Sequence, residues 1–165
     1  MLVLGCGGSG DDATAPDDDG GEDRPGGRVP EQLVGTWNFQ DAGDVYRDPN
    51  TGACSSSYAR SESLYLGADG TFEHALAAES SFPPCSLTVL HESEGMVEVD
   101  GSTLVLHIAE GRTRVEDTCG ETQGIDESGE SDRYTWELVG SGSGAAQLML
   151  TDANGNPIGP FSLQR

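Results

Sequence analysis

Three histidines, His74, His91 and His107, are the side chains of this sequence best suited to metal chemistry. A set of imidazoles can hold zinc, and histidine also ligates haem iron. His74 and His91 each alternate with apolar neighbours, so both face inward if their segments are strands. His107 lies between Leu106 and Ile108 and faces outward on the same pattern. We interpret each histidine as hydrogen-bonded or exposed, and we predict no metal and no cofactor.

Two segments carry oxygen-bearing side chains at spacings that resemble those of cation sites. The segment 152–156 begins like a calcium loop, but no glutamate stands at the twelfth position of that loop. Its Asn-Gly pair is a favoured turn dipeptide, so we predict a turn. The acidic residues Asp126, Glu127, Glu130 and Asp132 are interpreted as a solvated loop.

The motifs of common enzymes do not occur in the sequence. It contains no Gly-x-Ser-x-Gly elbow, P-loop or dinucleotide fingerprint. The run Ser141-Gly142-Ser143-Gly144 joins two predicted strands and leads into no helix. No cysteine lies in an evident Cys–His–acid arrangement. We therefore predict that the protein is not an enzyme.

The elements that must position these residues repeat apolar side chains with a period of two, which is typical of half-buried strands. Asp69-Gly70 and Asp100-Gly101 are hairpin turns on this reading, and Glu110-Gly111 is expected to turn the chain again. The predicted strands centre on residues 33–39, 64–66, 72–76, 86–91, 96–99, 104–108, 112–118, 134–138, 146–150 and 161–163. Successive hairpins without a long crossover favour an all-β, antiparallel up-and-down barrel of about 8–10 strands over a two-sheet sandwich.

The charge of the chain excludes one class of partner. Eight basic residues, all arginine, face 29 acidic ones, which gives a net charge of −21. Nucleic-acid binding requires basic residues that displace counterions from phosphates, so we predict no nucleic-acid partner. Docking on anionic lipid headgroups is disfavoured for the same reason.

The sequence Val3-Leu4-Gly5-Cys6 resembles a bacterial lipobox, the end of a lipoprotein signal peptide. The resemblance implies that Cys6 receives the lipid and becomes the mature N-terminus. Residues 1–6 are then the remnant of a signal peptide whose true start lies upstream. Gly7 is not aspartate, and this implies anchoring in the outer membrane, on its periplasmic or surface side.

Residues 7–28 are rich in Gly and Asp and lack large apolar side chains. Such a segment cannot bury enough surface to offset its conformational entropy, so we expect a disordered linker. The folded domain is expected to span residues 29–165, within the usual size of one domain.

The domain resembles bacterial lipocalin-like lipoproteins in an ordered series of motifs. Gly35-Thr36-Trp37 opens the first strand, Asp69-Gly70-Thr71-Phe72 forms a turn, Cys54 and Cys85 flank the hairpin, and Gly101 to Leu104 begins a later hairpin. The resemblance implies that Gly35 bends the backbone at the barrel base and that Trp37 plugs it. Arg165 or Arg133 is a candidate for covering this Trp.

Two functions follow as expectations. The first is a lipid-anchored module that holds a small apolar ligand inside the barrel. The candidate ligand-binding residues are Trp37, Phe39, Leu66, Phe72, His74, His91, Leu106, Tyr134 and Trp136. The inward set also includes Leu64, Leu76, Leu104 and Leu148, and the whole set fits a packed core equally well. The second function is a structural or interaction module with a filled core, whose contacts lie in the loops 41–59 and 119–131.

An exported domain lies where disulfides persist, and three cysteines besides Cys6 allow one bridge. We predict that Cys54 pairs with Cys85, because the two flank the hairpin between residues 64 and 76. A bridge between Cys85 and Cys119 is the alternative.

Overall fold

The computed structural model describes residues 28–47, 54–82, 84–140 and 146–164. The chain of these ranges forms nine strands. They are β1 (Gly35–Arg47), β2 (Cys54–Leu66), β3 (Thr71–Phe82), β4 (Cys85–Asp100), β5 (Thr103–Asp117), β6 (Gln123–Asp126), β7 (Ser131–Gly140), β8 (Ala146–Asp152) and β9 (Pro157–Gln164). Within these ranges no helix is long and apolar enough to cross a membrane.

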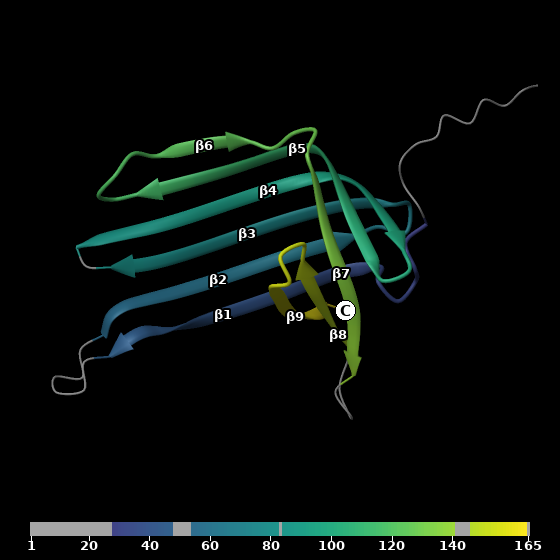
Figure 1. The fold of residues 1–165 in the computed structure, drawn as a ribbon, viewed down its shortest axis with the longest axis horizontal. Helices are drawn as coiled ribbons and strands as arrows, with labels where there is room; N and C mark the ends of the chain where they lie inside the picture. The colour runs from purple at the N-terminus through teal and green to yellow at the C-terminus, as the bar shows by residue number, and fades with distance from the viewer. Residues whose placement is uncertain (1–27, 48–53, 83, 141–145, 165) are drawn as a thin grey trace, which may run out of the picture.

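Eight of the strands close into an antiparallel barrel. The strands β1, β2, β3, β4 and β5 pair in sequence order, β7, β8 and β9 continue the series, and β9 pairs with β1. The strand β6 lies outside this ring and pairs with β5. This arrangement confirms the predicted all-β fold and the up-and-down barrel (Figure 1).

The barrel closes around only one end of the long strands. The strand β9 pairs with β1 at Thr36–Asn38, and β7 pairs with β5 at Thr103–His107. Beyond these pairings, β1 to β5 extend away from the ring together with β6, as Figure 1 shows. We call this second part the open sheet.

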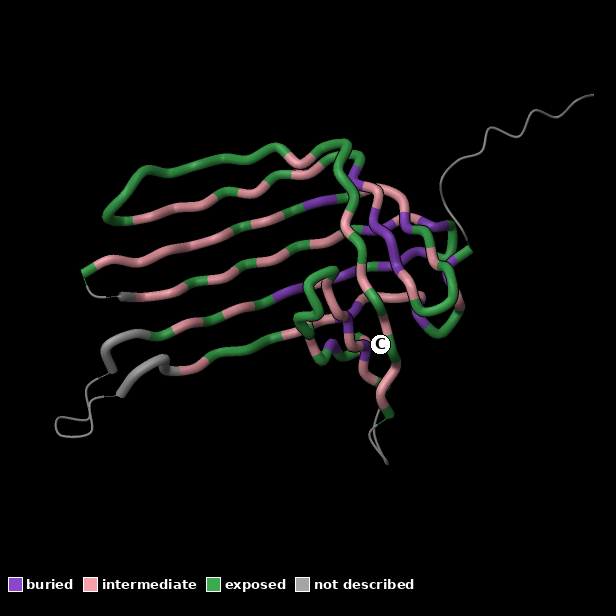
Figure 2. The backbone as a smooth tube through the Cα atoms, in the orientation of Figure 1, coloured by how far each residue is buried: buried purple, intermediate pink, exposed green. Residues whose placement is uncertain are grey.

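The closed end is filled by its own side chains. Trp37 is 1% exposed, and its indole nitrogen donates a 2.7 Å hydrogen bond to the carbonyl of Leu33. The buried residues gather at this end in Figure 2. The largest of them are Trp37, Phe72, Phe161, Leu33, Leu64, Leu66, Leu104, Leu106, Leu148 and Val97. A small barrel filled in this way has a packed core at its closed end.

Two strands are longer than the apolar pattern predicts. The segments 86–91 and 96–99 belong to the single strand β4, and 104–108 and 112–118 belong to β5. The turn predicted at Glu110-Gly111 is therefore wrong. A register shift between Glu94 and Gly95 interrupts the apolar alternation there, because a β-bulge changes which face the following residues occupy.

The bulge depends on the absence of a side chain at Gly95. A Cβ at this position would collide with the carbonyl oxygen of His107 and would lie 2.8 Å from the backbone nitrogen of Ala109. The close backbone approach occurs where the strands leave the closed ring, because Gly95 pairs with Ile108, directly after the last residue of β5 that pairs with β7. Gly95 thus allows the two parts of the fold to share the same strands.

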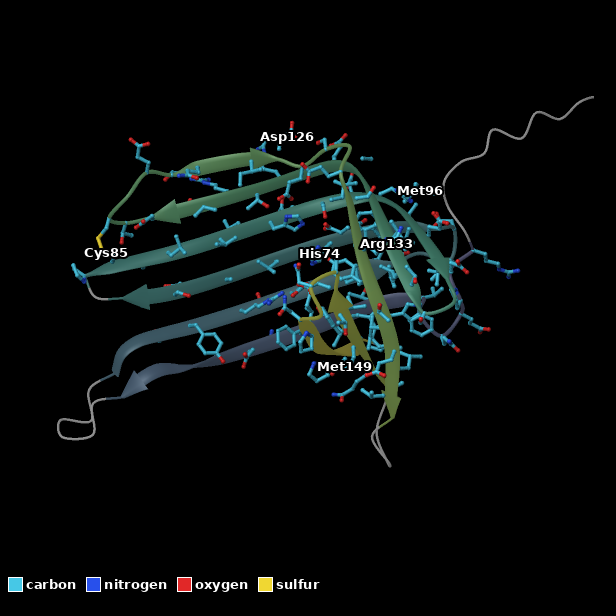
Figure 3. The ribbon with its side chains drawn as sticks, in the orientation of Figure 1. His74, Cys85, Met96, Asp126, Arg133 and Met149 are labelled. Carbon is cyan, nitrogen blue, oxygen red and sulfur yellow. A yellow bond between two sulfur atoms is a disulfide. The ribbon has the colours of Figure 1, made fainter. Side chains whose placement is uncertain are left out.

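The predicted pairing of Cys54 with Cys85 is wrong, because Cys85 is bonded to Cys119. The chain reverses a second time between β3 and β4, so Cys85 lies beside the end of β5, where Leu87 pairs with Asp117. Cys54 begins β2, and β3 separates β2 from β4. The bridge lies at the tip of the open sheet (Figure 3).

The predicted long loops are partly strand. The strand β1 continues to Arg47 and β2 begins at Cys54, while β6 occupies part of the segment 119–131. These extensions carry polar residues on both faces, so they lack the apolar alternation that indicates a strand. Residues 1–27, with Cys6 and most of the predicted linker, lie outside the described ranges, as do 48–53 and Arg165.

Candidate functional site

The open sheet presents two faces that follow from its register. The inner face continues the interior of the barrel, and Trp37, Leu64 and His74 are consecutive cross-strand partners on it. The outer face carries Thr36, Tyr65 and the residues opposite them. Along β3 the side chains alternate between partly buried on the inner face and exposed on the outer face.

The outer face is hollowed where the open sheet meets the barrel. A groove of about 1140 Å³ crosses all six strands from β1 to β6. Its outward-facing lining residues are Thr36, Ser63, Tyr65, Glu73, Ala75, Glu92, Glu94, Glu110, Arg112, Gly124 and Asp126. We call this feature the outer groove. Its lining combines small side chains with one aromatic ring and several charged side chains.

A row of glutamates crosses the outer groove. Glu73 lies directly opposite Glu94, and Glu94 lies directly opposite Glu110. Like charges in such positions destabilise a sheet. Tyr65 continues the row and is 38% exposed, which is unusual for a large aromatic side chain in a strand. No salt bridge of the described residues involves any of these three glutamates.

A second row carries the basic residue of the groove. Arg112 stands opposite Glu92 on one side and Asp126 on the other. Hydrogen bonds from Ser128 hold the pKa of Asp126 below its ordinary value, and the charge of Arg112 adds to this effect. Asp126 is therefore ionised at neutral pH, and the groove is strongly acidic overall.

The inner face beneath the groove carries a polar cluster. Glu62 is 6% exposed, and its carboxylate accepts a 2.6 Å contact from Arg60 and lies 2.8 Å from Nε2 of His74. The rings of His74 and His91 are 5.1 Å apart on the inner face, the direction that their alternation predicted for both. Nδ1 of His74 is buried without a partner among the described residues.

His91 has partners on both ring nitrogens. Its Nδ1 lies 2.9 Å from Oγ1 of Thr113 and 2.9 Å from Oε2 of Glu127, and its Nε2 lies 3.0 Å from Oγ of Ser93. Thr113 in turn donates to Oε1 of Glu127 at 3.1 Å. We call Glu62, His74, His91 and Glu127 the histidine cluster.

Contacts in and around the histidine cluster shift the pKa values of Glu62 and Tyr134. Burial raises the pKa of Glu62, but contacts with His74 and Arg60 outweigh burial and leave this pKa below its ordinary value. Burial raises the pKa of Tyr134 far above its ordinary range, and the charges of Asp132 and Glu62 raise it further. Glu62 is thus a carboxylate and Tyr134 a neutral phenol at neutral pH.

Ser93, His91 and Glu127 have the atom order of a Ser–His–acid triad. A nucleophile must be reached by its substrate, however, and Ser93 is only 7% exposed in the middle of β4. We interpret the three residues as a structural hydrogen-bond chain.

The structure places the predicted ligand-binding residues in two groups. Trp37, Leu66, Phe72 and Leu106 are at most 2% exposed within the core. The partly buried residues that pack against the core or line the inner face are Phe39, Tyr134, Trp136, His74 and His91. The aromatic Phe39 contacts Phe161, with ring centroids 5.7 Å apart, and the guanidinium of Arg60 lies over its ring.

Other predicted features fall elsewhere. His107 faces outward, as predicted, beside Ser131 and Glu98. Asp152 accepts hydrogen bonds from the backbone of Asn154 and Asn156, so the predicted turn is confirmed. Within the described ranges, no three His, Cys, Asp or Glu residues are placed to share a metal ion.

Two residues of the histidine cluster escaped sequence analysis. Glu62 shares a face with Leu64 and Leu66, so a charged residue in an apolar alternation was the available signal. Glu127 was predicted in a solvated acidic loop, and only the pairing of β6 with β5 carries it to the inner face. No apolar alternation in the sequence predicts the pairing of β6 with β5.

Comparison of the chain with protein-family models, with curated proteins and with solved structures finds no match. The candidate function therefore depends on the geometry of the outer groove and the histidine cluster.

Proposed function

We propose that the chain is a lipid-anchored, non-enzymatic interaction module of the bacterial cell envelope. Its outer groove binds a protein segment that carries positive charge. The observation that carries the proposal is the cross-strand row of Glu73, Glu94 and Glu110 in a hollowed surface.

The packed interior supports an interaction module over a ligand carrier. A carrier of apolar molecules needs space in the barrel, whereas Leu66, Leu104, Leu148 and Phe161 are completely buried against one another. The resemblance to lipocalin-like lipoproteins therefore supports a shared barrel fold more strongly than a shared role in carrying apolar ligands.

Electrostatics support a basic partner. Like charges held opposite each other cost stability, and a cationic partner would offset this repulsion while it gains charge complementarity. The exposed ring of Tyr65 offers a face on which an arginine or lysine can pack.

The folded domain begins at the closed end of the barrel, and this is where a lipid on Cys6 would connect to it. Val29 and Leu33 belong to the core of the closed end, whereas the Cys85–Cys119 bridge lies at the tip of the open sheet (Figure 3). A lipid on Cys6 would therefore tether the domain through its closed end, with residues 7–28 as a flexible linker.

Photo-crosslinking in the native envelope tests the groove. We expect a photoreactive amino acid at Ala75, which lines the outer groove, to capture a discrete protein partner. The same amino acid at Thr135, exposed on β7, is the matched control and should capture none.

Charge reversal then tests the chemistry of that contact. Glu94→Arg should abolish the crosslink at Ala75, and Glu137→Arg, an exposed change on β7, should leave it intact. Capture at Thr135 alone, or capture at Ala75 that survives Glu94→Arg, would contradict the proposal.

A further inference from the structure

We propose that the histidine cluster is a proton-operated latch that fastens the β6 edge of the outer groove to the sheet. The inference deepens the proposed function, on which its role in partner binding rests, because residues 124–128 include part of the groove lining. The device itself lies within the chain and can be tested without a partner.

The latch consists of contacts from the segment after β6 to the inner face. Glu127 reaches His91 and Thr113, while Ser128 accepts a hydrogen bond from the backbone of Gly111 at 3.2 Å. Backbone bonds from Glu127 to Gly111 and from Gly129 to Ile108 complete it. The strand β6 itself is exposed along its whole length, so these contacts add to the ladder with β5 and to the Cys85–Cys119 bridge in attaching it.

Protonation changes the latch at His91. A neutral imidazole carries one N–H, so it can donate to only one of its partners. The imidazolium donates from both nitrogens, at Nδ1 toward Glu127 and at Nε2 toward Ser93. The contact with Glu127 then becomes a charge-assisted hydrogen bond, which is stronger than a neutral one.

His74 cannot replace His91 in this role. Its Nε2 faces Glu62, but its Nδ1 is buried without a partner, so an imidazolium at this position would bury an unpaired N–H. A second positive ring 5.1 Å from the first would also be repelled. We assign the switching proton to His91.

Charged groups approach the two rings from several elements. Glu62 and Arg60 approach from β2, Glu127 approaches from the segment after β6, and Tyr134 of β7 stays neutral beside Glu62. Asp132 of β7 adds a further carboxylate beside Tyr134, so the carboxylates around the rings outnumber the single guanidinium and would offset a positive charge on His91.

Amide hydrogen exchange of the full chain tests the latch. Between about pH 7.5 and about pH 5.5, the range in which histidine titrates, protection of Glu127 and Gly129 should rise after correction for intrinsic rates. The difference between a neutral and a charged hydrogen bond predicts a rise of about fivefold.

Three variants separate the latch from a merely structural role. His91→Gln and Glu127→Gln keep hydrogen-bonding groups and should remove the pH response, whereas His74→Gln should preserve it. Protection that does not change with pH in the wild-type chain, or a response lost in His74→Gln and kept in His91→Gln, would overturn the inference. Crosslinking at Ala75 reports independently on the groove, so either idea can fail alone.

Discussion

Glu62 is a buried carboxylate on the inner face, and its polar neighbours explain how the charge is tolerated there. Burial of a lone charge is costly, but Arg60 and His74 engage both of its oxygens. These contacts leave the pKa of Glu62 below its ordinary value of 4.5. The ion is therefore favoured more in the folded chain than in the unfolded chain.

Stability should consequently fall with acid in a way that Glu62 controls. A lowered folded-state pKa contributes stability above the unfolded value, and this contribution is lost as the pH drops through the folded pKa. We expect Glu62→Gln to lose less unfolding free energy than the wild type between about pH 5.5 and about pH 3. Urea unfolding at the two pH values measures the difference, and an equal loss in both proteins would refute this assignment.

Leu66 separates a core role from a ligand-binding role. The side chain is completely buried. Leu66→Ala should cost about 2–5 kcal/mol of unfolding free energy, the usual range for leucine in a packed core. Leu90→Ala, at a side chain that is 40% exposed, should change stability by less than about 0.5 kcal/mol. A near-neutral Leu66→Ala, measured by urea unfolding, would indicate a cavity wall.

Sequence alternation predicted the direction of the side chains better than their role. It placed Trp37, Leu66 and Phe72 inward, and it gave His74 and His91 their correct inward direction. Filled cores and ligand cavities use the same inward pattern, so alternation alone could not distinguish them. Glu127 could not be predicted because its inward position depends on a tertiary pairing.

At the level of elements, the bulge at Gly95 couples the barrel to the open sheet. A methyl group at this position would meet the backbone of β5, which cannot move as a flexible side chain can. Gly95→Ala should therefore destabilise the fold by about 1–3 kcal/mol, a typical cost of overpacking.

Gly124 supplies the matched control for that change. A Cβ at Gly124 would meet nothing within 4 Å, so Gly124→Ala should leave the midpoint of thermal unfolding almost unchanged. If both variants melted alike, the close approach at Gly95 would not be a structural requirement.

The disulfide joins β4 to the segment after β5 and closes a loop with a sequence separation of 34 residues. Its loss in Cys119→Ser should cost about 4 kcal/mol in the chain-entropy model, measurable as a lower urea midpoint. Tryptic digestion without reductant should yield residues 61–112 linked to 115–133. A peptide that contains Cys54 linked to 61–112 would restore the pairing that sequence analysis favoured.

The error in the predicted Cys54–Cys85 pairing came from the strands in which the two cysteines lie. The hairpin of β2 and β3 was predicted correctly from its Asp69-Gly70 turn. The second reversal before Cys85 moves this residue one strand further along the sheet, away from β2. The apolar pattern ended the second strand of the hairpin at residue 76, whereas β3 continues to Phe82 and Cys85 already begins β4.

On the scale of the whole molecule, one set of long strands builds two different structures. The closed end buries a core, and the open sheet exposes an acidic groove on one face with the histidine cluster on the other. The net charge of −21 suits the proposed cationic partner. Composition and period predicted the barrel, but register was needed to align the glutamates of the groove.

Carboxyl-group footprinting in the native envelope tests the central claim most directly. The labelling of Glu73, Glu94 and Glu110 in intact cells is compared with that in the purified full chain, and Glu137 on β7 serves as the internal reference. Occupation of the outer groove predicts that the three glutamates are protected in cells while Glu137 is labelled equally in both samples. Equal labelling of all four residues in both samples would contradict the groove as the binding surface.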